Sequence, residues 1–409
     1  MLNRQQVARG LIAGFLVLTL AACGASSDNG SSANAGESAG PKPTGPKPTG
    51  TPLVIGVIGS LTGPQASSSS QGDTVAPAWA EWFNAAGGIN GHPIKIVSVD
   101  DGGDPAKAQA AAAKLIDQEN VLAIVVGSDN LAPAYGSAVR AKGVPLISGS
   151  ANTGDWYKET GMFPTVTDVV SGKYTQLLVA KNFGKAKKYG ELYCAEIAAC
   201  ASTVGMQKAN AEKLGMEYTA LPISSTATSY TAQCLQLQQK GVDYVQLNLS
   251  TAPAIKLIQD CQAQSYNPTW GSSANALSKQ MAELKNVTIW GPAYAFPSVA
   301  DLAPAKVFRD AMLNYAKDDN WHEGTAGLTW SGLEVLRKAL ADVGPNPTRK
   351  DVMDALYQVK NEDLDGLLAN KITFTAGQPT APLSHPCAFV LKVADGKTTS
   401  PSEKVCANS

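Results

Sequence analysis

Short apolar runs that alternate with helical segments constrain the fold of this chain more than any other feature. Leu53–Gly59 (LVIGVIG), Ile94–Asp100 (IKIVSVD), Val121–Gly127 (VLAIVVG) and Val144–Ser148 (VPLIS) are dominated by apolar residues, and the stretches between them have helical periodicity. Runs of this kind, separated by helices of about 10–15 residues, predict a parallel sheet that is covered on both faces.

A second series of the same kind follows the irregular stretch 149–168. We expect strands at 189–194, 217–221, 244–249, 287–290 and 387–393, with helices between them and near 301–317, 325–342 and 349–360. The roughly 355 residues that follow Leu53 are too many for one average core and suit two. The predicted fold is therefore α/β, with two doubly wound parallel-sheet lobes.

The N-terminal residues have a different character. Arg4 and Arg9 precede the apolar run 11–20, and Leu20-Ala21-Ala22-Cys23 fits the pattern at which bacterial lipoproteins are cleaved and lipidated. A run of this length is too short to span a bilayer. An ordinary secretory signal followed by an accidental cysteine is the alternative. We predict a lipoprotein signal peptide at 1–22 and a lipid on Cys23, which places the protein outside the cytoplasm, on the outer face of the cell membrane or on the periplasmic side.

Residues 23–51 lack large apolar side chains and end in a tandem Gly-Pro-Lys-Pro-Thr repeat. Such a composition cannot form a core, so we expect a flexible tether that contributes nothing to the folded body.

Six cysteines remain after Cys23, and an even number in an oxidising compartment predicts disulfides. Cys234 and Cys261 fall on consecutive expected helices that flank one strand, which places both on the same face of the sheet. Several pairings are possible. We favour Cys194 with Cys200, Cys234 with Cys261, and Cys387 with Cys406.

Patterns of catalysis are missing from the sequence. Gly396-Lys397-Thr398 resembles the end of a phosphate-binding loop, but position 391 is Leu rather than Gly, and we expect a hairpin or loop there. His92, His322 and His385 lack metal-ligand spacing or a triad order, and we expect them at the surface. The formal net charge is −1, or about −3 without Arg4 and Arg9, and no basic cluster points to nucleic acid. We expect no enzymatic activity, no cofactor and no metal.

Three motifs resemble those of the leucine-binding type of periplasmic binding protein, the type I fold. They are Ile58–Gly63 (IGSLTG), Asn84–Gly91 (NAAGGING) and Val99-Asp100-Asp101 followed by Asp104-Pro105, and the resemblance extends from about residue 52 to the end. It implies a monomeric receptor of an ABC importer for branched-chain amino acids, amides, urea or related solutes. It also implies a three-segment hinge near Asp168, Ala295 and Phe374. One lobe would then comprise 52–168 and 297–373, and the other 169–296 and 374–409.

Ligands of doubly wound sheets bind outside the carboxyl ends of the strands, so the candidate site residues are those just beyond the strands. Each of them is also a residue type that is common in helix caps, turns or packing. The resemblance implies that the segment 148–152 holds a ligand carboxylate. The candidates are Gln71, Asp129, Asn130, Ser150, Ala151 and Asn152 in the first lobe, and Glu196, Ser250, Ser273 and Tyr294 in the second.

Two departures from the resemblance concern the ligand. Relatives tend to have an aromatic residue where Gln71 stands, and an acid near 271–275 that pairs with the ligand ammonium, where this chain has Gly, Ser, Ser, Ala and Asn. Without that acid an amino acid loses a strong charge-assisted bond, unless Glu196 or Asp129 replaces it. We therefore expect a small polar or amino-acid-like ligand ahead of leucine, isoleucine or valine, delivered to an ABC permease. A sensor that feeds a signalling partner and an extracytoplasmic hydrolase are the alternatives.

Overall fold

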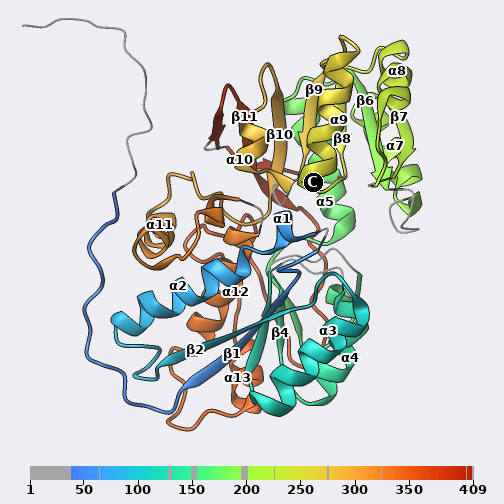
Figure 1. Ribbon diagram of the computed structural model, residues 1–409. Coiled ribbons are helices and arrows are strands. Elements are labelled where there is room, and N and C mark those ends of the chain that lie inside the picture. The colour runs from blue at the N-terminus through green and yellow to red at the C-terminus, as the bar shows by residue number, and fades with distance from the viewer. Residues whose placement is uncertain are drawn as a thin grey trace, which may run out of the picture. The chain divides into compact units, whose positions relative to one another are not determined.

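A five-stranded parallel sheet forms the first half of the molecule (Figure 1). Its strand order is β2-β1-β3-β4-β5, and every neighbouring pair is parallel. Short crossovers with helices connect the strands, as the apolar runs predict. The elements are β1 (Leu53–Gly59), α1 (Ala66–Ser69), α2 (Gly72–Ala85), β2 (Ile94–Asp100), α3 (Pro105–Ala113), the π-helical η1 (Lys114–Gln118), β3 (Ala123–Val126), α4 (Ala132–Ala141), β4 (Leu146–Ser148), the 3-10 helix η2 (Gly154–Tyr157) and β5 (Met162–Pro164).

A second, eight-stranded sheet has the order β12-β11-β10-β9-β8-β6-β7, with β13 paired to β11. Its pairings are parallel from β7 to β10 and antiparallel among β10, β11, β12 and β13. The elements are α5 (Val169–Asn182), β6 (Lys188–Cys194), α7 (Val204–Lys213), β7 (Glu217–Ile223), α8 (Thr231–Gln239), β8 (Tyr244–Leu247), α9 (Thr251–Ala263), β9 (Thr269–Ser272), α10 (Lys279–Ala282), β10 (Thr288–Ala293), β11 (Cys387–Ala394), β12 (Lys397–Thr399) and β13 (Val405–Cys406).

The segment between β10 and β11 returns to the first sheet. It contains α11 (Ala303–Tyr315), η4 (Asn320–His322), α12 (Ala326–Ala339) and α13 (Arg349–Leu356). Helices α11 and α12 contact α2, and α12 also contacts β3 and β4. We call the first sheet with its helices lobe 1 and the second lobe 2. The chain passes between them after β5, after β10 and after α13; the predicted boundaries at 168, 297 and 374 lie in these passages and stay predictions.

This computed structural model describes residues 38–63, 65–127, 131–148, 154–194, 201–224, 226–273, 276–323, 325–401 and 403–407. Residues 39–409 form one unit, to which the contacts below belong. Within the described ranges, no helix combines the length and the apolar character that crossing a membrane requires.

The predicted parallel pairing holds throughout the first sheet and from β7 to β10, and the C-terminal strands β11, β12 and β13 add antiparallel pairs to the second sheet. Strands β11 and β12 form a hairpin at Asp395 and Gly396, whose φ angles of 52° and 75° suit a tight turn between antiparallel strands. The expected hairpin at 396–398 is thus present. Strands β5 and β9 were not expected, because three or four residues with Pro, Gly and Ser carry little strand signal.

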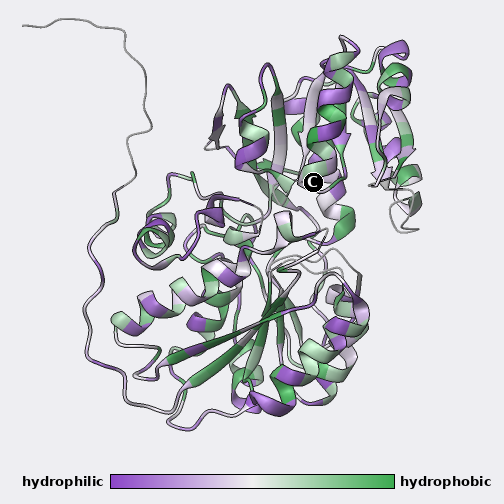
Figure 2. Cartoon of the chain, in the orientation of Figure 1, coloured by the Kyte–Doolittle hydropathy of each residue, from purple (hydrophilic) through white to green (hydrophobic). Residues whose placement is uncertain are grey.

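Apolar strands and aromatic side chains form the core of lobe 1. Figure 2 shows β1 and β2 largely green, whereas strands of the second sheet contain long pale stretches. Trp330 is 1 % exposed and packs edge-on against Phe308 with ring centroids 5.2 Å apart. His92 is also buried, which corrects its expected surface position, because its Nδ1 lies 2.7 Å from the carbonyl oxygen of Thr51.

Residues 40–51 differ from the expected flexible tether, because they lie along lobe 1. The backbone N–H of Gly45 donates to the carbonyl of Ala85, and that of Gly50 donates to the carbonyl of Gly91. Composition alone does not reveal this contact, because the partners are backbone groups far along the chain.

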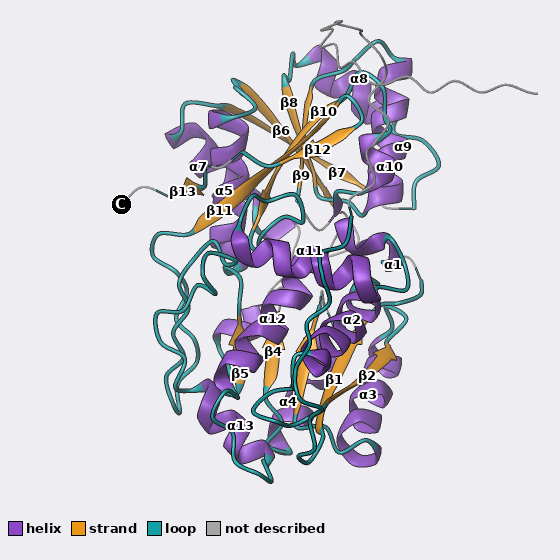
Figure 3. Cartoon of the chain, turned by 90° about the vertical axis from the view of Figure 1, so that its left-hand side faces the viewer, coloured by secondary structure: helices purple, strands orange, loops and turns teal. Residues whose placement is uncertain are grey.

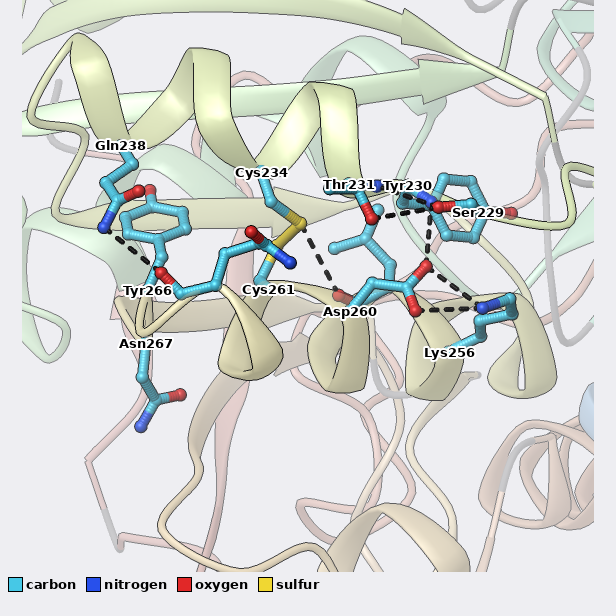
Figure 4. The surroundings of a disulfide bond; sticks show 12 residues. Ser229, Tyr230, Thr231, Cys234, Gln238, Lys256, Asp260, Cys261, Tyr266 and Asn267 are labelled. Carbon is cyan, nitrogen blue, oxygen red and sulfur yellow. Dashed lines mark hydrogen bonds and ion pairs between the residues drawn. A yellow bond between two sulfur atoms is a disulfide. The ribbon is translucent and has the colours of Figure 1, made fainter.

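Two of the favoured disulfides are present. Cys234 on α8 bonds Cys261 on α9, with Cα atoms 5.0 Å apart (Figure 4). Cys387 bonds Cys406 across β11 and β13. Beside the first bond, the carboxylate of Asp260 accepts from the backbone N–H of Tyr230 at 2.8 Å. Cys200 and the side chain of Cys194 lie outside the described residues, so that pairing stays a prediction.

Replacing Cys234 and Cys261 together by Ser should lower the free energy of unfolding by about 2–4 kcal/mol, because the bond closes a loop in the unfolded chain. Urea denaturation of the oxidised proteins measures the loss. Ala263→Ser, at an exposed position on the same helix, is the matched control and should change little. Free thiols at both positions in non-reducing peptide maps would contradict the assigned pair.

Candidate functional site

The carboxyl ends of parallel strands lie at one edge of each sheet, and polar side chains gather there. In lobe 1, Asp100 at the end of β2 accepts from the backbone N–H groups of Leu61, Thr62 and Gly102 at 2.9, 3.2 and 2.8 Å. The Thr62 hydroxyl donates to its second oxygen at 2.6 Å. Burial raises the pKa of Asp100, but these hydrogen bonds outweigh it and lower that pKa below 3.8.

The next residue, Asp101, is fully buried. Its carboxylate accepts from the hydroxyl of Ser60 at 2.6 Å and from the backbone N–H of Gly103 at 2.8 Å. Among the described residues, its other carboxylate oxygen has no hydrogen-bond partner. Asp104 then caps α3 through the backbone N–H groups of Ala106 and Lys107. The motif residues that resemble the leucine-binding type therefore join the ends of β1 and β2 and fix the floor of this edge.

Gln71 lies inside lobe 1 and is 1 % exposed. Its amide oxygen accepts from the backbone N–H and the hydroxyl of Thr325 at 3.3 and 3.1 Å, which joins the start of α2 to the start of α12. Gly127 at the end of β3 packs against the same helix, because a Cβ there would lie 2.8 Å from the hydroxyl oxygen of Thr329. A ligand contact by Gln71 stays a prediction; in this structure its amide serves the packing of the lobe.

Lobe 2 holds a buried carboxylate inside its sheet, at the middle of β6. Glu191 on β6 is 0 % exposed. It accepts from the ammonium of Lys173 at 2.8 Å, the hydroxyl of Tyr218 at 2.5 Å and the amide of Asn248 at 2.9 Å. These partners come from α5, β7 and the loop after β8, so one charge joins three elements. Burial beside this carboxylate raises the pKa of Tyr218.

Further polar groups share this face of the second sheet. Tyr189 and Tyr244 stack with centroids 5.6 Å apart, and Gln246, two residues beyond Tyr244, pairs with Glu191. Within the described part of the chain, both phenol groups and the Gln246 amide oxygen lack hydrogen-bond partners. Gly271 is required beside them, because a Cβ would lie 2.4 Å from that amide oxygen. The sheet therefore has a polar interior face.

Three candidates of lobe 2 lie at its strand ends. Ser250 is the N-cap of α9, but its hydroxyl makes no capping hydrogen bond to the described helix. Ser273 follows β9 and is partly exposed. Tyr294 follows β10 and donates its hydroxyl to the carbonyl of Gly172 at 3.0 Å. Burial raises the pKa of Tyr294 to about 12, with a hydrogen bond to Thr175 acting against it.

The structure does not describe the remaining candidates. Asp129, Asn130, Ser150, Ala151, Asn152 and Glu196 lie outside the described ranges, and their roles stay predictions.

The passages between the lobes pair with one another. The backbone N–H of Phe296 donates to Leu367 at 2.9 Å, and that of Ala369 donates to Tyr294 at 3.3 Å. Asp168, at the first passage, caps α5 through the backbone N–H of Val170 at 3.0 Å. Paired passages of this kind let two bodies rotate while their connection stays intact.

A separate contact joins the lobes away from these passages. The backbone N–H of Lys279, the first residue of α10, donates to the carboxylate of Glu323 beside η4 at 2.6 Å. The ammonium of Lys279 lies 3.6 Å from the carboxylate of Asp319, with both side chains about two-thirds exposed. We expect the hydrogen bond to the half-buried Glu323 to be the stronger of the two, because an ion pair between two exposed side chains contributes little.

A cavity of 590 Å³ lies at the opposite end of the first sheet, beside Asn120, Lys142 and Arg349. The Arg349 guanidinium donates to the carbonyls of Val121 and Ile116. The guanidinium therefore binds backbone groups of lobe 1 itself and is not directed at a ligand in the cavity.

The sequence contained signals for some of the groups that we did not select. A Glu inside the strand KYGELYC and a Gln inside YVQL interrupt apolar runs, and a buried polar group needs partners. Nothing in one sequence identifies those partners. Among the described residues, no group of three His, Cys, Asp or Glu side chains could hold a metal.

Asp100→Asn should lower the free energy of unfolding by about 1 kcal/mol at pH 7, because the backbone donors lose a charged acceptor. The folded pKa lies below 3.8, so the contribution is complete above that pH and is lost as the pH falls through the folded value. Urea titrations at pH 7 and pH 3 measure this. Asp395→Asn, in an exposed turn, is the control. An equal loss at both pH values would contradict the proposed cause.

Glu323→Ala should favour separation of the lobes, because it removes the acceptor of the Lys279 N–H. Small-angle X-ray scattering of the ligand-free protein should show a radius of gyration about 1 Å above the roughly 21 Å expected for a body of this size. Asp319→Asn breaks only the exposed pair and should leave the radius unchanged. If both variants scatter like the unaltered protein, this hydrogen bond does not hold the lobes.

Comparisons with known proteins agree on one family. Residues 52–397 match the model of the family described as periplasmic binding protein. A curated amino acid binding protein of Pseudomonas aeruginosa is 41% identical over 102 residues, and a Leu/Ile/Val-binding protein homolog of Brucella melitensis is 28% identical over 103 residues. The first match covers 24% of this chain and 27% of that relative, the second 25% and 28%, so the chain spans about a quarter of each.

Solved structures share the fold at low identity. A leucine binding protein of Thermotoga maritima has a TM-score of 0.69 at 16% identity, covering 86% of this chain and 98% of that one. A fatty acid ABC transporter substrate-binding protein of Thermomonospora curvata has a TM-score of 0.68 at 20% identity, covering 88% and 94%. With two α/β lobes and a family match over most of its length, the chain belongs to the periplasmic binding protein family.

Proposed function

We propose that this protein is a lipid-anchored extracytoplasmic receptor that binds a small solute between its lobes and delivers it to an ABC permease. The observation that carries the proposal is the family match over residues 52–397, on a chain whose two sheets are joined by paired passages. Binding would occur where the carboxyl ends of the two sheets face a common ligand, as in other doubly wound folds.

Closure is the proposed mechanism of capture. A ligand that contacts both lobes binds the closed arrangement more tightly than the open one and so shifts the population toward it. Helix α1 of lobe 1 comes within contact range of α9 of lobe 2, and Lys279 bonds Glu323. These contacts show where the lobes meet, and the permease would recognise the closed state.

For the ligand we propose a small polar or amino-acid-like solute. Glu191 is already neutralised by Lys173, so it does not serve as the acid for a ligand ammonium. In the segment 271–275, the described residues 271–273 are a glycine and two serines, and none of them is an acid. Relatives of the same fold are named for leucine and for fatty acid, so the fold does not set the ligand class. The segments 129–130, 150–152 and 196, with Ser250, Ser273 and Tyr294, are the proposed contacts.

Anchoring by Cys23 completes the proposal. It would hold the receptor at the outer face of the membrane, or on the periplasmic side, near its permease. Replacing Cys23 by Ser and fractionating the cells tests the anchor, since a variant that stays membrane-bound would refute it.

Calorimetry with alanine, small amides, urea, leucine, isoleucine and valine tests the ligand class. We expect the small polar members to bind more tightly than the branched ones, because a site built on hydrogen bonds rejects solutes that lack the matching group. Ser150→Ala combined with Asn152→Ala should weaken binding at least about tenfold. Thr288→Ala, at the amino end of β10, is the control. Tight leucine binding that survives the double substitution would overturn both the ligand class and the site.

A further inference from the structure

The tandem repeat before β1 forms a strap along lobe 1, which we define as residues 40–51. It follows the grey trace in Figure 1 and runs on the side that faces the viewer in Figure 3. At its start, the backbone N–H of Gly40 donates to the carboxylate of Asp310 at 3.0 Å, and the amide of Asn314 donates to the Gly40 carbonyl at 3.0 Å. Both partners are on α11.

The strap continues to the end of α2 and to the turn before β2. The N–H of Gly45 donates to the Ala85 carbonyl at 2.8 Å, and the N–H groups of Thr49 and Gly50 donate to the Gly91 carbonyl at 3.1 and 2.9 Å. Thr51 ends the strap with a hydrogen bond from its hydroxyl to the side chain of Asn346 at 3.0 Å.

The repeat places a glycine at each close approach. A Cβ would lie 2.6 Å from the Asp310 carboxylate at Gly40, 2.2 Å from the Ala86 carbonyl oxygen at Gly45, and 2.8 Å from the His92 ring at Gly50. The prolines between them favour an extended backbone that advances about 3.1 Å per residue, or about 15 Å per repeat. Each glycine of the repeat, five residues from the next, therefore coincides with one close approach to the lobe.

Charge and stacking support the same path. The ammonium of Lys42 lies 4.7 Å from the ring centroid of Tyr315, beyond the Gly40 contact on α11. The threonines of the repeat, Thr44 and Thr49, have exposed side chains that are not closely packed against the lobe. Glycine and proline positions thus carry the docking, and the threonine side chains do not.

We propose that the strap sets the point and the direction at which the anchored end of the chain leaves the folded body. This rests on the proposed lipid on Cys23. With the strap docked, residues 24–39 alone join the anchor to α11, and their maximum span is about 55 Å; without docking, residues 24–51 could span about 95 Å. Lobe 1 is the anchored lobe in either case, because the chain continues directly into β1; the docked strap moves the exit point to α11, keeps the lobe closer to the membrane and so raises its effective concentration at a membrane partner.

Hydrogen exchange of the mature protein tests the docking without any lipid. Amides of Gly40, Gly45, Thr49 and Gly50 should exchange at least about tenfold more slowly than unstructured peptide in the unaltered protein. They should lose that protection when Gly40, Gly45 and Gly50 are all replaced by Val. Thr44→Val with Thr49→Val changes the same repeats at exposed positions and should keep it. Unprotected amides in the unaltered protein would overturn the strap.

A second variant changes the α11 residues that bind the strap and leaves the strap sequence unaltered. Asp310→Ala with Asn314→Ala deletes the partners of Gly40 and should release that end while Gly50 stays protected. Full protection of Gly40 in this variant would contradict the assigned contacts, even if the triple valine variant failed to fold.

Energy transfer from a dye at Asp318→Cys to acceptor-labelled lipid tests the orientation in lipid nanodiscs. We expect efficient transfer for the lipidated protein and a broader, weaker distribution for the triple valine variant. Equal distributions for two nanodisc-bound proteins would overturn the orienting role. A protein that does not bind nanodiscs at all would instead refute the lipid anchor, while the exchange result would stand by itself.

Discussion

Parallel pairing of strands is the constraint on which the rest of this structure depends. It sends the carboxyl ends of the parallel strands of each sheet to one edge, where ligands of doubly wound folds bind. The edge must then be held without consuming the residues that bind a ligand. Asp100 and Asp101 do this in lobe 1, where they bind the loop after β1. In lobe 2, Glu191 in the middle of β6 instead joins α5, β7 and the loop after β8.

The two lobes achieve rigidity by different means. Lobe 1 has an apolar sheet packed with aromatic side chains, and the burial of this apolar surface is its main source of rigidity. Lobe 2 places a charge, two phenols and an amide on the face that α5 covers. A buried carboxylate is tolerated only because Lys173, Tyr218 and Asn248 satisfy it. Among the described residues, the hydroxyls of Tyr189 and Tyr244 and the amide oxygen of Gln246 have no hydrogen-bond partner, and buried water is the usual partner in such polar sites.

Periodicity predicted most of the fold because a buried strand leaves a continuous apolar run in the sequence. The run LVIGVIG became β1 at the expected residues, whereas Met162–Pro164 and Thr269–Ser272 are too short to leave a pattern. Partners distant in sequence could not be predicted: Glu191 binds residues 18, 27 and 57 positions away, and nothing local pairs them. Of the expected site residues, Gln71 lies inside the lobe, and Ser250, Ser273 and Tyr294 lie at strand ends, where topology alone had placed them.

The tandem repeat shows why composition is a weak guide to a segment's role. Gly, Pro, Lys and Thr predict a linker because none of them can form a core, and that reasoning is correct for the segment by itself. A core is not required for docking, however. Backbone N–H groups at Gly40, Gly45 and Gly50 find acceptors that the lobe already presents, and proline lowers the entropy that the strap loses on binding. A repeat whose glycines all coincide with close approaches is therefore better explained by the surface beneath it than by flexibility.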